Sequence, residues 1–171
     1  MSVFESHSSS LNYLDGEYRR FPRATDSCTN LLRRSKDGLV IPNGLVVSPD
    51  YDRRGHLGEA LLLCAIAPLF ASTHREAVQH ISASPISVIL CEDRLSDGSY
   101  RELLPLVRSF HPLSPLIVIS PTGDWPDYFE AIDRGAYDFL AFPLIPGELQ
   151  RIVTNHLKAA FQHSLPFDSL T

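Results

Sequence analysis

The chain has 171 residues, a net charge of −5 and an apolar share of 44%. This length fits one domain with an extension and suffices to bury a core. The negative charge argues against a nucleic-acid-binding surface, which needs a clustered basic face. The sequence shows no basic, apolar leader and no apolar run of the roughly 20 residues that cross a bilayer. We therefore expect a cytoplasmic protein with no nucleic-acid or membrane partner.

The three cysteines lie far apart in the sequence, at Cys28, Cys64 and Cys91. No CxxC pair and no Cys/His spacing typical of a zinc site occurs. Cys64 and Cys91 stand inside apolar runs, where a cysteine is usually a small core residue. We expect no metal or other cofactor from these positions.

Composition changes near residue 43. Residues 1–43 are rich in serine, arginine and aspartate and show no sustained period. We interpret them as an N-terminal extension that is partly disordered. Within it, Arg19–Arg23 (Arg-Arg-Phe-Pro-Arg) is either a docking segment or a solvated linker, and the linker is the preferred interpretation.

From residue 44, short apolar runs alternate with stretches of helical spacing. The apolar runs predict five buried parallel strands: Gly44–Ser48, Leu69–Ala71, Ile86–Cys91, Leu116–Ser120 and Ala136–Phe142. The stretches that follow them predict five helices, over about Arg53–Ile66, Thr73–Ser82, Gly98–Phe110, Asp124–Gly135 and Pro146–Gln162.

Local signals mark several of the predicted helix ends. Pro68 is expected to stop the first helix. Thr73 with Glu76 has the spacing of a capping box for the second. Asp124 is expected to cap the fourth helix, and Gly135 to end it.

Five strands alternating with five helices predict a doubly wound α/β domain over residues 44–162, followed by a C-terminal tail over 163–171. Right-handed crossovers place helices on both faces. We expect the flavodoxin-like (βα)5 order 2-1-3-4-5, with a functional crevice at the carboxyl ends of the first and third strands.

Two segments carry a more specific pattern. Glu92–Gly98 reads Glu-Asp-Arg-Leu-Ser-Asp-Gly, and Ala131–Pro143 reads Ala-Ile-Asp-Arg-Gly-Ala-Tyr-Asp-Phe-Leu-Ala-Phe-Pro. They resemble the receiver domains of bacterial response regulators, in which these segments commonly read Asp-x-Arg-Leu-Pro-Asp-Gly and Ala-x-x-x-Gly-Ala-x-Asp-Tyr/Phe-Leu-x-Lys-Pro. The resemblance covers about residues 44–162.

The resemblance puts Glu92 at the position of the phospho-accepting aspartate. The family's two metal-binding acids correspond to Ser48 and Pro49, which leaves Asp50 as a weak metal candidate. The family's phosphoryl-binding lysine corresponds to Phe142. Phosphoryl transfer to a carboxylate needs a nucleophile, a metal ion and a cation. The resemblance therefore implies a degenerate pseudo-receiver without a Mg²⁺ requirement.

The switch positions are retained. By resemblance, Ser120 corresponds to the hydroxyl that follows the phosphoryl group, and Phe139 to the aromatic residue that rotates inward on activation. Pro143 corresponds to the family's proline that follows a cis peptide bond. For Glu92, two interpretations stay open: a built-in negative charge that mimics the phosphorylated state, or an inert, solvated carboxylate.

We therefore expect an atypical, stand-alone receiver in two-component-type signal transduction, not an enzyme, that acts by protein–protein contact without aspartyl phosphorylation. Its partner, or a second copy, would bind the face made by the fourth helix, the fifth strand and the fifth helix. There, Trp125 and Tyr128 either expose an aromatic patch or pack into the domain.

Two alternatives remain. One is a phosphorelay receiver that accepts phosphate at Glu92 or Asp93. The other is a small-molecule-sensing module that uses the emptied crevice near four residues of the strand ends: Ser48, Glu92, Ser120 and Phe142.

Overall fold

The computed structural model describes residues 34–35, 38–39 and 41–163. Most of the predicted extension over 1–43 and nearly all of the predicted tail over 163–171 lie outside these residues. In the described part of the extension, β1 (Arg34–Ser35) and β2 (Gly38–Leu39) form a short antiparallel ladder. The partly disordered state predicted for the extension stays a prediction.

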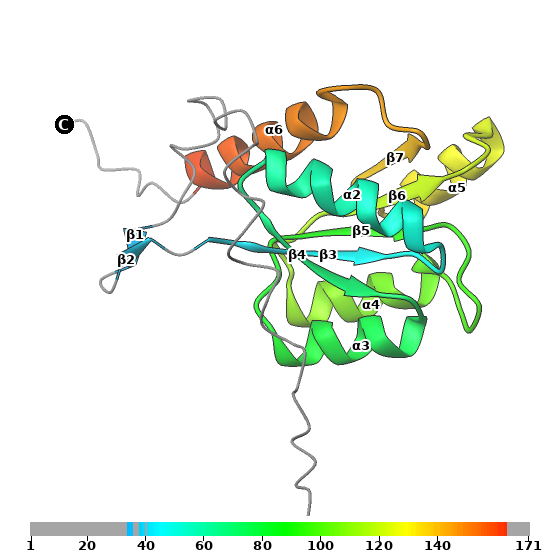
Figure 1. The fold of residues 1–171 in the computed structure, drawn as a ribbon, viewed down its shortest axis with the longest axis horizontal. Coiled ribbons are helices and arrows are strands. Elements are labelled where there is room, and N and C mark those ends of the chain that lie inside the picture. The colour runs from blue at the N-terminus through cyan, green and yellow to red at the C-terminus, as the bar shows by residue number, and fades with distance from the viewer. Residues whose placement is uncertain (1–33, 36–37, 40, 164–171) are drawn as a thin grey trace, which may run out of the picture.

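The domain is built on one five-stranded parallel sheet (Figure 1). Its strands are β3 (Asn43–Val47), β4 (Ala67–Ala71), β5 (Val88–Glu92), β6 (Leu116–Ser120) and β7 (Asp138–Ala141). They lie side by side in the order β4-β3-β5-β6-β7, and every neighbouring pair is parallel. This is the order 2-1-3-4-5, so the predicted flavodoxin-like fold is confirmed.

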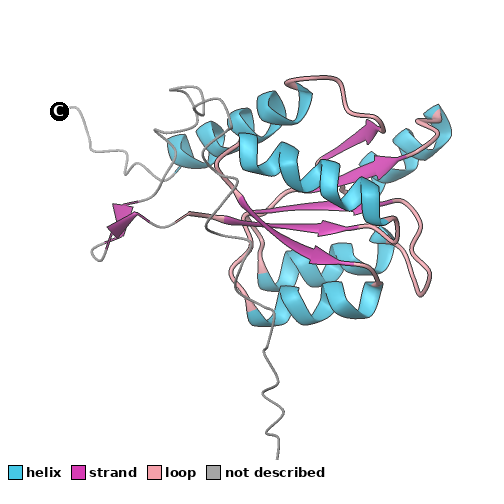
Figure 2. Cartoon of the chain, viewed as in Figure 1, coloured by secondary structure: helices cyan, strands magenta, loops and turns pink. Residues whose placement is uncertain are grey.

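A helix follows each strand of this sheet, as Figure 2 shows. The helices are α2 (Tyr51–Leu63), α3 (His74–Ala83), α4 (Tyr100–Phe110), α5 (Trp125–Arg134) and α6 (Glu148–His163). Helices α2 and α6 cover one face of the sheet, and α3, α4 and α5 pack against the other. No helix in the described part of the chain is long and apolar enough to cross a membrane.

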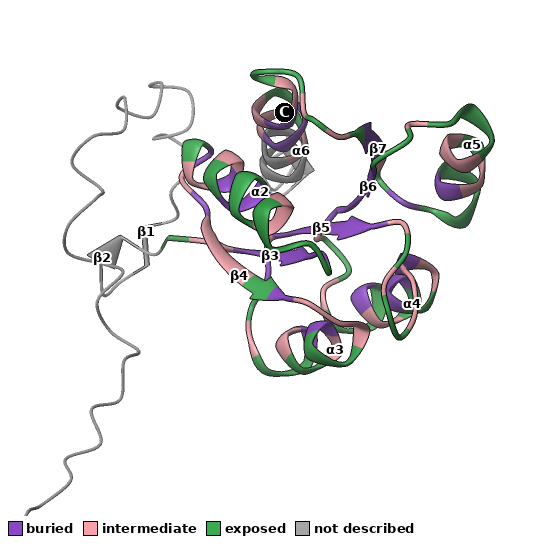
Figure 3. Ribbon diagram, turned by 45° about the vertical axis from the view of Figure 1, so that its right-hand side comes forward, coloured by how far each residue is buried: buried purple, intermediate pink, exposed green. Residues whose placement is uncertain are grey.

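The central strands are buried on both faces (Figure 3). Because side chains alternate along a strand, Leu45 and Val47 of β3 join the core under α3 and α4, whereas Val46 joins the core under α2 and α6. The continuous apolar runs of the sequence therefore reflect a sheet with two covered faces.

The first helix begins and ends earlier than predicted. Asp50 caps α2, because its side chain accepts a hydrogen bond of 2.8 Å from the backbone N–H of Arg53. The helix ends at Leu63, and Ala65 then takes a φ of 58°, which is incompatible with continued helix. Pro68 is not the stop: it lies inside β4, at the edge of the sheet, where a missing N–H is tolerated.

The two predicted helix caps are met only in part. Thr73 accepts from the backbone N–H of Glu76 at 3.2 Å, as expected. The Glu76 carboxylate instead binds the backbone N–H of Ser72, at 2.6 Å, so the reciprocal half of the capping box is shifted by one residue. Asp124 occupies the N-cap position of α5, but its side chain makes no capping hydrogen bond. Gly135 ends α5 in the left-handed conformation, at φ 95°.

The glycines of the first strand and helix allow a matched stability test. A methyl group on Gly44 would meet side-chain carbons of Leu61, Ile66 and Val88 at 2.8, 2.9 and 3.0 Å, inside the core. We expect Gly44→Ala to lower the free energy of unfolding by about 1–3 kcal/mol through overpacking. Gly55 lies mid-helix on the surface with open space around it. Gly55→Ala should therefore stabilise by about 0.5–1 kcal/mol.

Urea unfolding followed by circular dichroism measures both changes. Equal effects of the two substitutions would contradict the packing described here for β3 against α2.

Candidate functional site: a buried ion pair at the carboxyl edge of the sheet

The acceptor-equivalent residue lies where the strand order of the sheet reverses. Strands β3 and β5 are neighbours, with Val47 opposite Cys91. Ser48 directly follows β3, and Glu92 is the last residue of β5. In open α/β sheets, this edge is where ligands and reactive groups lie. The fold thus brings Ser48 and Glu92 together, although they are 44 residues apart in the chain.

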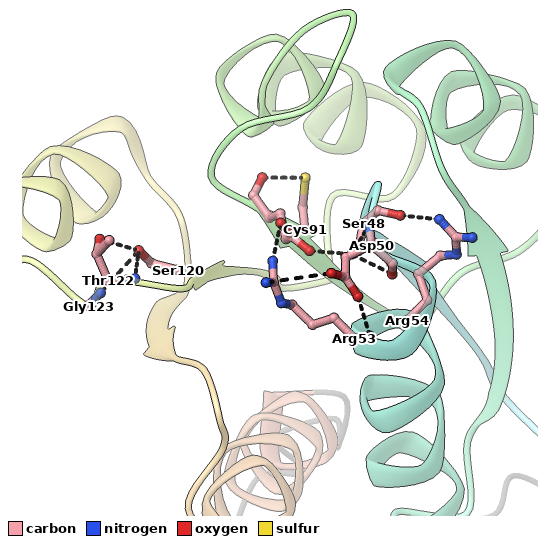
Figure 4. Close-up of polar contacts among 9 residues, drawn as sticks. Ser48, Asp50, Arg53, Arg54, Cys91, Ser120, Thr122 and Gly123 are labelled. Carbon is pink, nitrogen blue, oxygen red and sulfur yellow. Dashed lines mark hydrogen bonds and ion pairs between the residues drawn. The ribbon is translucent and has the colours of Figure 1, made fainter.

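Glu92 is buried, with only 3% of its surface exposed. The Ser48 hydroxyl donates a hydrogen bond to its Oε1. The guanidinium of Arg53 donates to its Oε2 at 2.7 Å and forms an ion pair with it (Figure 4). Both carboxylate oxygens are therefore engaged by side chains of the protein. This arrangement differs from the solvated carboxylate that was one of the two interpretations of the sequence.

Arg53 reaches Glu92 from the first turn of α2. Its backbone is fixed by the Asp50 cap, and the backbone N–H of Asp50 donates to the Ser48 hydroxyl at 3.1 Å. The strand end, the cap and the ion pair therefore form one connected network. Figure 4 shows Ser48, Asp50 and Arg53 gathered in one cluster.

The aromatic ring of Phe142 contacts the same guanidinium. The Arg53 guanidinium carbon lies 5.2 Å from the centroid of the Phe142 ring, within cation–π range. By the resemblance, Phe142 corresponds to the family's lysine, and the sequence showed no cation there. The structure places the Arg53 guanidinium of α2 beside this ring. The sequence reasoning missed Arg53, although its place just after the first strand could have indicated it.

The residues at the metal-equivalent positions do not fit a Mg²⁺ ion. Mg²⁺ requires oxygen ligands in near-octahedral geometry, but the Glu92 oxygens are taken by Ser48 and the cationic Arg53. The Asp50 carboxylate caps α2, and the hydrogen bond from the Arg53 backbone N–H lowers the pKa of Asp50. Pro49 is exposed. Among the described residues, no group of three or more His, Cys, Asp or Glu side chains is placed to hold a metal ion.

The Ser120 hydroxyl is directed to its own turn. It is fully buried and accepts backbone N–H groups of Gly123 at 3.2 Å and Thr122 at 3.4 Å. It also lies 3.2 Å from the Thr122 hydroxyl, and Figure 4 shows these residues as a separate group. The fold places Ser120 at the end of β6 but gives it local partners.

The other switch-equivalent residue, Phe139, is buried in β7. Its ring makes an edge contact with Tyr128 of α5, with centroids 6.0 Å apart. The peptide bond between Phe142 and Pro143 is cis. The backbone N–H of Phe142 donates to the Ser120 carbonyl at 2.8 Å, which joins the ends of β6 and β7.

The second acid of the motif, Asp93, is only partly buried. Burial raises the pKa of its carboxyl group, Arg94 opposes this shift, and Asp127 adds to it. Its backbone N–H donates to the Ile119 carbonyl at 3.1 Å. Asp93 therefore continues the pairing of β5 with β6 beyond the strand.

Asp97 has a structural role that the sequence did not indicate. Its carboxylate accepts the backbone N–H groups of His74 at 2.6 Å and Arg75 at 3.1 Å. These hydrogen bonds lower the pKa of Asp97 and satisfy two donors at the start of α3. The loop that follows Glu92 is thereby tied to the neighbouring helix.

A groove of about 390 Å³ lies beside this site, between α2 and the segment that joins β7 to α6. Of the four residues predicted to surround a small-molecule crevice, only Phe142 lines this groove. The groove therefore lies outside the predicted crevice: Arg53 occupies the space beside Glu92, and Phe142 contributes to both places.

Comparisons with known proteins agree with this architecture. The chain is 29% identical over 114 residues to the response regulator protein PilR of Pseudomonas aeruginosa, which covers 67% of the chain and 26% of PilR. The signal receiver domain of a putative LuxO repressor protein from Vibrio parahaemolyticus has a TM-score of 0.66 at 23% identity, over 76% of this chain and 100% of that domain. The receiver domain of the Francisella response regulator 1452 has a TM-score of 0.62 at 22% identity, over 70% and 98% of the two chains. No family model matches the chain.

These likenesses support a response-regulator receiver domain of the CheY-like type. The solved structures show the fold, and the curated relatives that match include the response regulator PilR and a putative response regulator, NtrX-like. The chain spans about a quarter or less of the length of the curated relatives it matches. The match therefore concerns one part of those longer proteins and not their activity as a whole.

The ion pair leads to a stability prediction. Arg53→Met should leave Glu92 buried without its cation and lower the free energy of unfolding by about 3–5 kcal/mol. The double variant Arg53→Met/Glu92→Leu removes both charges and should recover most of that loss. Urea unfolding of the two single variants and the double variant gives the coupling free energy.

Arg151→Met is the matched control, because Arg151 is exposed on α6. It should change stability by no more than about 0.5 kcal/mol. Additive effects of Arg53→Met and Glu92→Leu would contradict a coupled pair.

Proposed function

We propose that this chain is an atypical receiver module of two-component-type signalling that acts by protein contact, independently of aspartyl phosphorylation. The observation that carries the proposal is the closed state of the acceptor position. Glu92 is buried, and Ser48 and Arg53 engage both of its oxygens. A phosphoryl donor would have to displace a buried ion pair before any carboxylate oxygen could attack.

The contacts of Glu92 also bear on whether the chain needs Mg²⁺ and whether it catalyses its own phosphorylation. An active receiver catalyses its own phosphorylation with Mg²⁺, a carboxylate and a cation, by the family resemblance. Here the cation is already paired with the carboxylate, and the remaining acid, Asp50, caps a helix. We therefore propose that the chain needs no Mg²⁺ and is not an enzyme.

The ion pair also favours one interpretation of Glu92. In a phosphorylated receiver, negative charge at the acceptor is met by a cation. In this chain, Glu92 carries the negative charge and Arg53 meets it at 2.7 Å. Phe139 is buried, which is the inward position that the family associates with activation. Both observations support a built-in, active-like arrangement over an inert carboxylate.

A phosphoryl-mimic titration tests the proposal. Adding Mg²⁺ to about 10 mM and then fluoroberyllate should leave the amide resonances of Glu92, Ser120 and Phe139 unshifted, because no open carboxylate and no metal site receives them. Two-dimensional NMR of the purified chain measures this. The variant Ser48→Asp/Pro49→Asp/Glu92→Asp/Phe142→Lys restores the family's residues and serves as a comparison.

Shifts of Glu92 and Ser120 in the unmodified chain would overturn the proposal and favour a working phosphorelay receiver. In that case, mass spectrometry after acetyl phosphate treatment would distinguish Glu92 from Asp93 as the acceptor.

We further propose that the output surface includes α5, the fourth helix of the domain, within the face that it forms with β7 and α6. Trp125 and Phe129 are 72% and 60% exposed, and Ile132 lies on the same side of the helix. Tyr128 instead packs on Phe139, so the two aromatic residues singled out in the sequence divide between the two predicted roles. Figure 3 shows exposed residues along α5.

An ionic cluster holds this helix in place. Arg101 of α4 donates two hydrogen bonds to the Glu130 carboxylate, at 2.8 and 2.6 Å, and Arg134 adds a third at 2.8 Å. The hydrogen bonds from Arg101, with the one from Arg134, lower the pKa of Glu130 to about 2. The two hydrogen bonds from Arg101 tie α5 to α4, so α5 presents its aromatic side in a defined orientation.

Self-association provides the test of this surface. If a second copy binds there, sedimentation velocity of the chain should show a concentration-dependent increase that Trp125→Ser/Phe129→Ser abolishes. Tyr51→Ser is the matched control, because Tyr51 is 79% exposed at the start of α2. A dimer that persists in the α5 variant and is lost in the Tyr51 variant would place the interface elsewhere. A monomer at every concentration would leave a different protein as the partner of α5.

A further inference from the structure

The groove beside Phe142 is apolar and carries no positive charge of its own. Its walls come from α2, with Ala60 and Leu63, and from the segment after β7, with Phe142, Pro143 and Ile145. None of the described residues that line it is a lysine or an arginine. The carboxylate of Glu59, which is exposed on α2, lies at the groove instead. An occupant with an aromatic or prolyl body flanked by positive charge would complement these walls.

The chain contains one such segment. Arg19–Arg23 reads Arg-Arg-Phe-Pro-Arg, with three arginines and no acid in five residues, in a protein of net charge −5. It lies outside the residues that the structure describes. The function proposed above does not use it.

The point where the chain enters the domain is close to the groove. The carbonyl of Pro42 accepts a hydrogen bond of 2.8 Å from the backbone N–H of Ala67. Ala67 is four residues beyond Leu63, which lines the end of the groove where α2 stops. The 18 residues from 24 to 41 connect Arg23 to Pro42. Since β1 and β2 fold back on each other, with Arg34 opposite Leu39, the reach comes mainly from the ten residues 24–33, which span at most roughly 35 Å when extended. That still exceeds the length of α2, about 20 Å.

We propose that Arg19–Arg23 docks in cis into the groove between α2 and the β7–α6 segment. Phe21 and Pro22 would pack on Phe142 and its neighbouring prolines, and the flanking arginines would pair with Glu59. Because a segment tethered to its own binding site has an effective concentration of about a millimolar, modest contacts suffice to hold it. This inference is independent of whether Glu92 accepts phosphate.

Docking there would contact the ion pair through one side chain. Phe142 lines the groove and also lies under the Arg53 guanidinium that neutralises Glu92. Its ring is 6.2 Å from that of His56, which lines the same groove. An occupied groove would thus restrict the Phe142 ring and connect the N-terminal segment to the acceptor position.

A spin label on the native Cys28 tests the docking in the full chain. Cys28 lies five residues after Arg23, and the other two cysteines, Cys64 and Cys91, are buried. With the nitroxide oxidised, we expect a selective loss of amide intensity at Glu59–Leu63 and at Leu144–Ile145, and recovery when the label is reduced. Arg19→Glu/Arg20→Glu should restore those intensities, as should Glu59→Lys on the groove side.

Two matched controls separate docking from a general charge effect. Arg33→Glu/Lys36→Glu makes the same charge change elsewhere in the N-terminal region and should leave the broadening in place. Asp133→Lys, on an exposed position of α5, should do the same. Two results would overturn the proposal: no broadening at the groove, or uniform broadening that neither Arg19→Glu/Arg20→Glu nor Glu59→Lys changes.

The last experiment distinguishes docking within one molecule from docking between two. Isotope-labelled chain without the nitroxide is mixed with spin-labelled chain that carries no isotope. We expect no loss of intensity in this mixture. Broadening at the groove would show that the segment binds a second copy, and would overturn docking in cis.

Discussion

The contact between Arg53 and Glu92 organises the functional end of this domain. A carboxylate buried beside Cys91 and under α2 would be strongly destabilising by itself, because burial without a partner removes its hydration. Arg53 at 2.7 Å and the Ser48 hydroxyl compensate for that loss. The first turn of α2, its Asp50 cap and the end of β3 all take part in holding the guanidinium there. The ends of β3 and β5 and the start of α2 are thus fixed by one network.

This network gives the chain a different electrostatic balance from the one its family resemblance implies. In the family, the crevice gathers acids that need a metal ion, and a lysine that awaits the phosphoryl group. Here one carboxylate and one cation neutralise each other within the protein, and Phe142 covers the guanidinium. The domain keeps the shape of a phosphorylation switch while its central charges are already paired. That is why we place its function in surfaces and partners, with α5 as the exposed aromatic element.

Much of the fold was predictable from the sequence. The five strands, their order and most helices follow from apolar runs and helical spacing, because these periodicities report which faces are covered. The positions and caps of the helix ends were harder to predict. Asp124 has the right type and position for a cap, yet its side chain forms no capping bond. Glu76 satisfies Ser72 and not the N-cap residue itself. Such details depend on side-chain rotation and on distances below an ångström, which spacing rules do not contain.

The sequence predicted where the residues of the candidate site lie in the fold, but not which side chains contact them. The sequence by itself determined that Glu92 directly follows the third predicted strand, Ile86–Cys91, at the carboxyl edge of the sheet. It also determined that Phe142 holds no positive charge and that Ser48 and Pro49 cannot act as acids. Only the tertiary structure decided what surrounds Glu92. Arg53 is 39 residues away in the chain, and its place just after the first strand was the one sequence signal for this contact. Their contact exists because β3 and β5 pair side by side and α2 crosses back over them, and burial there makes a paired charge much more stable than a single one.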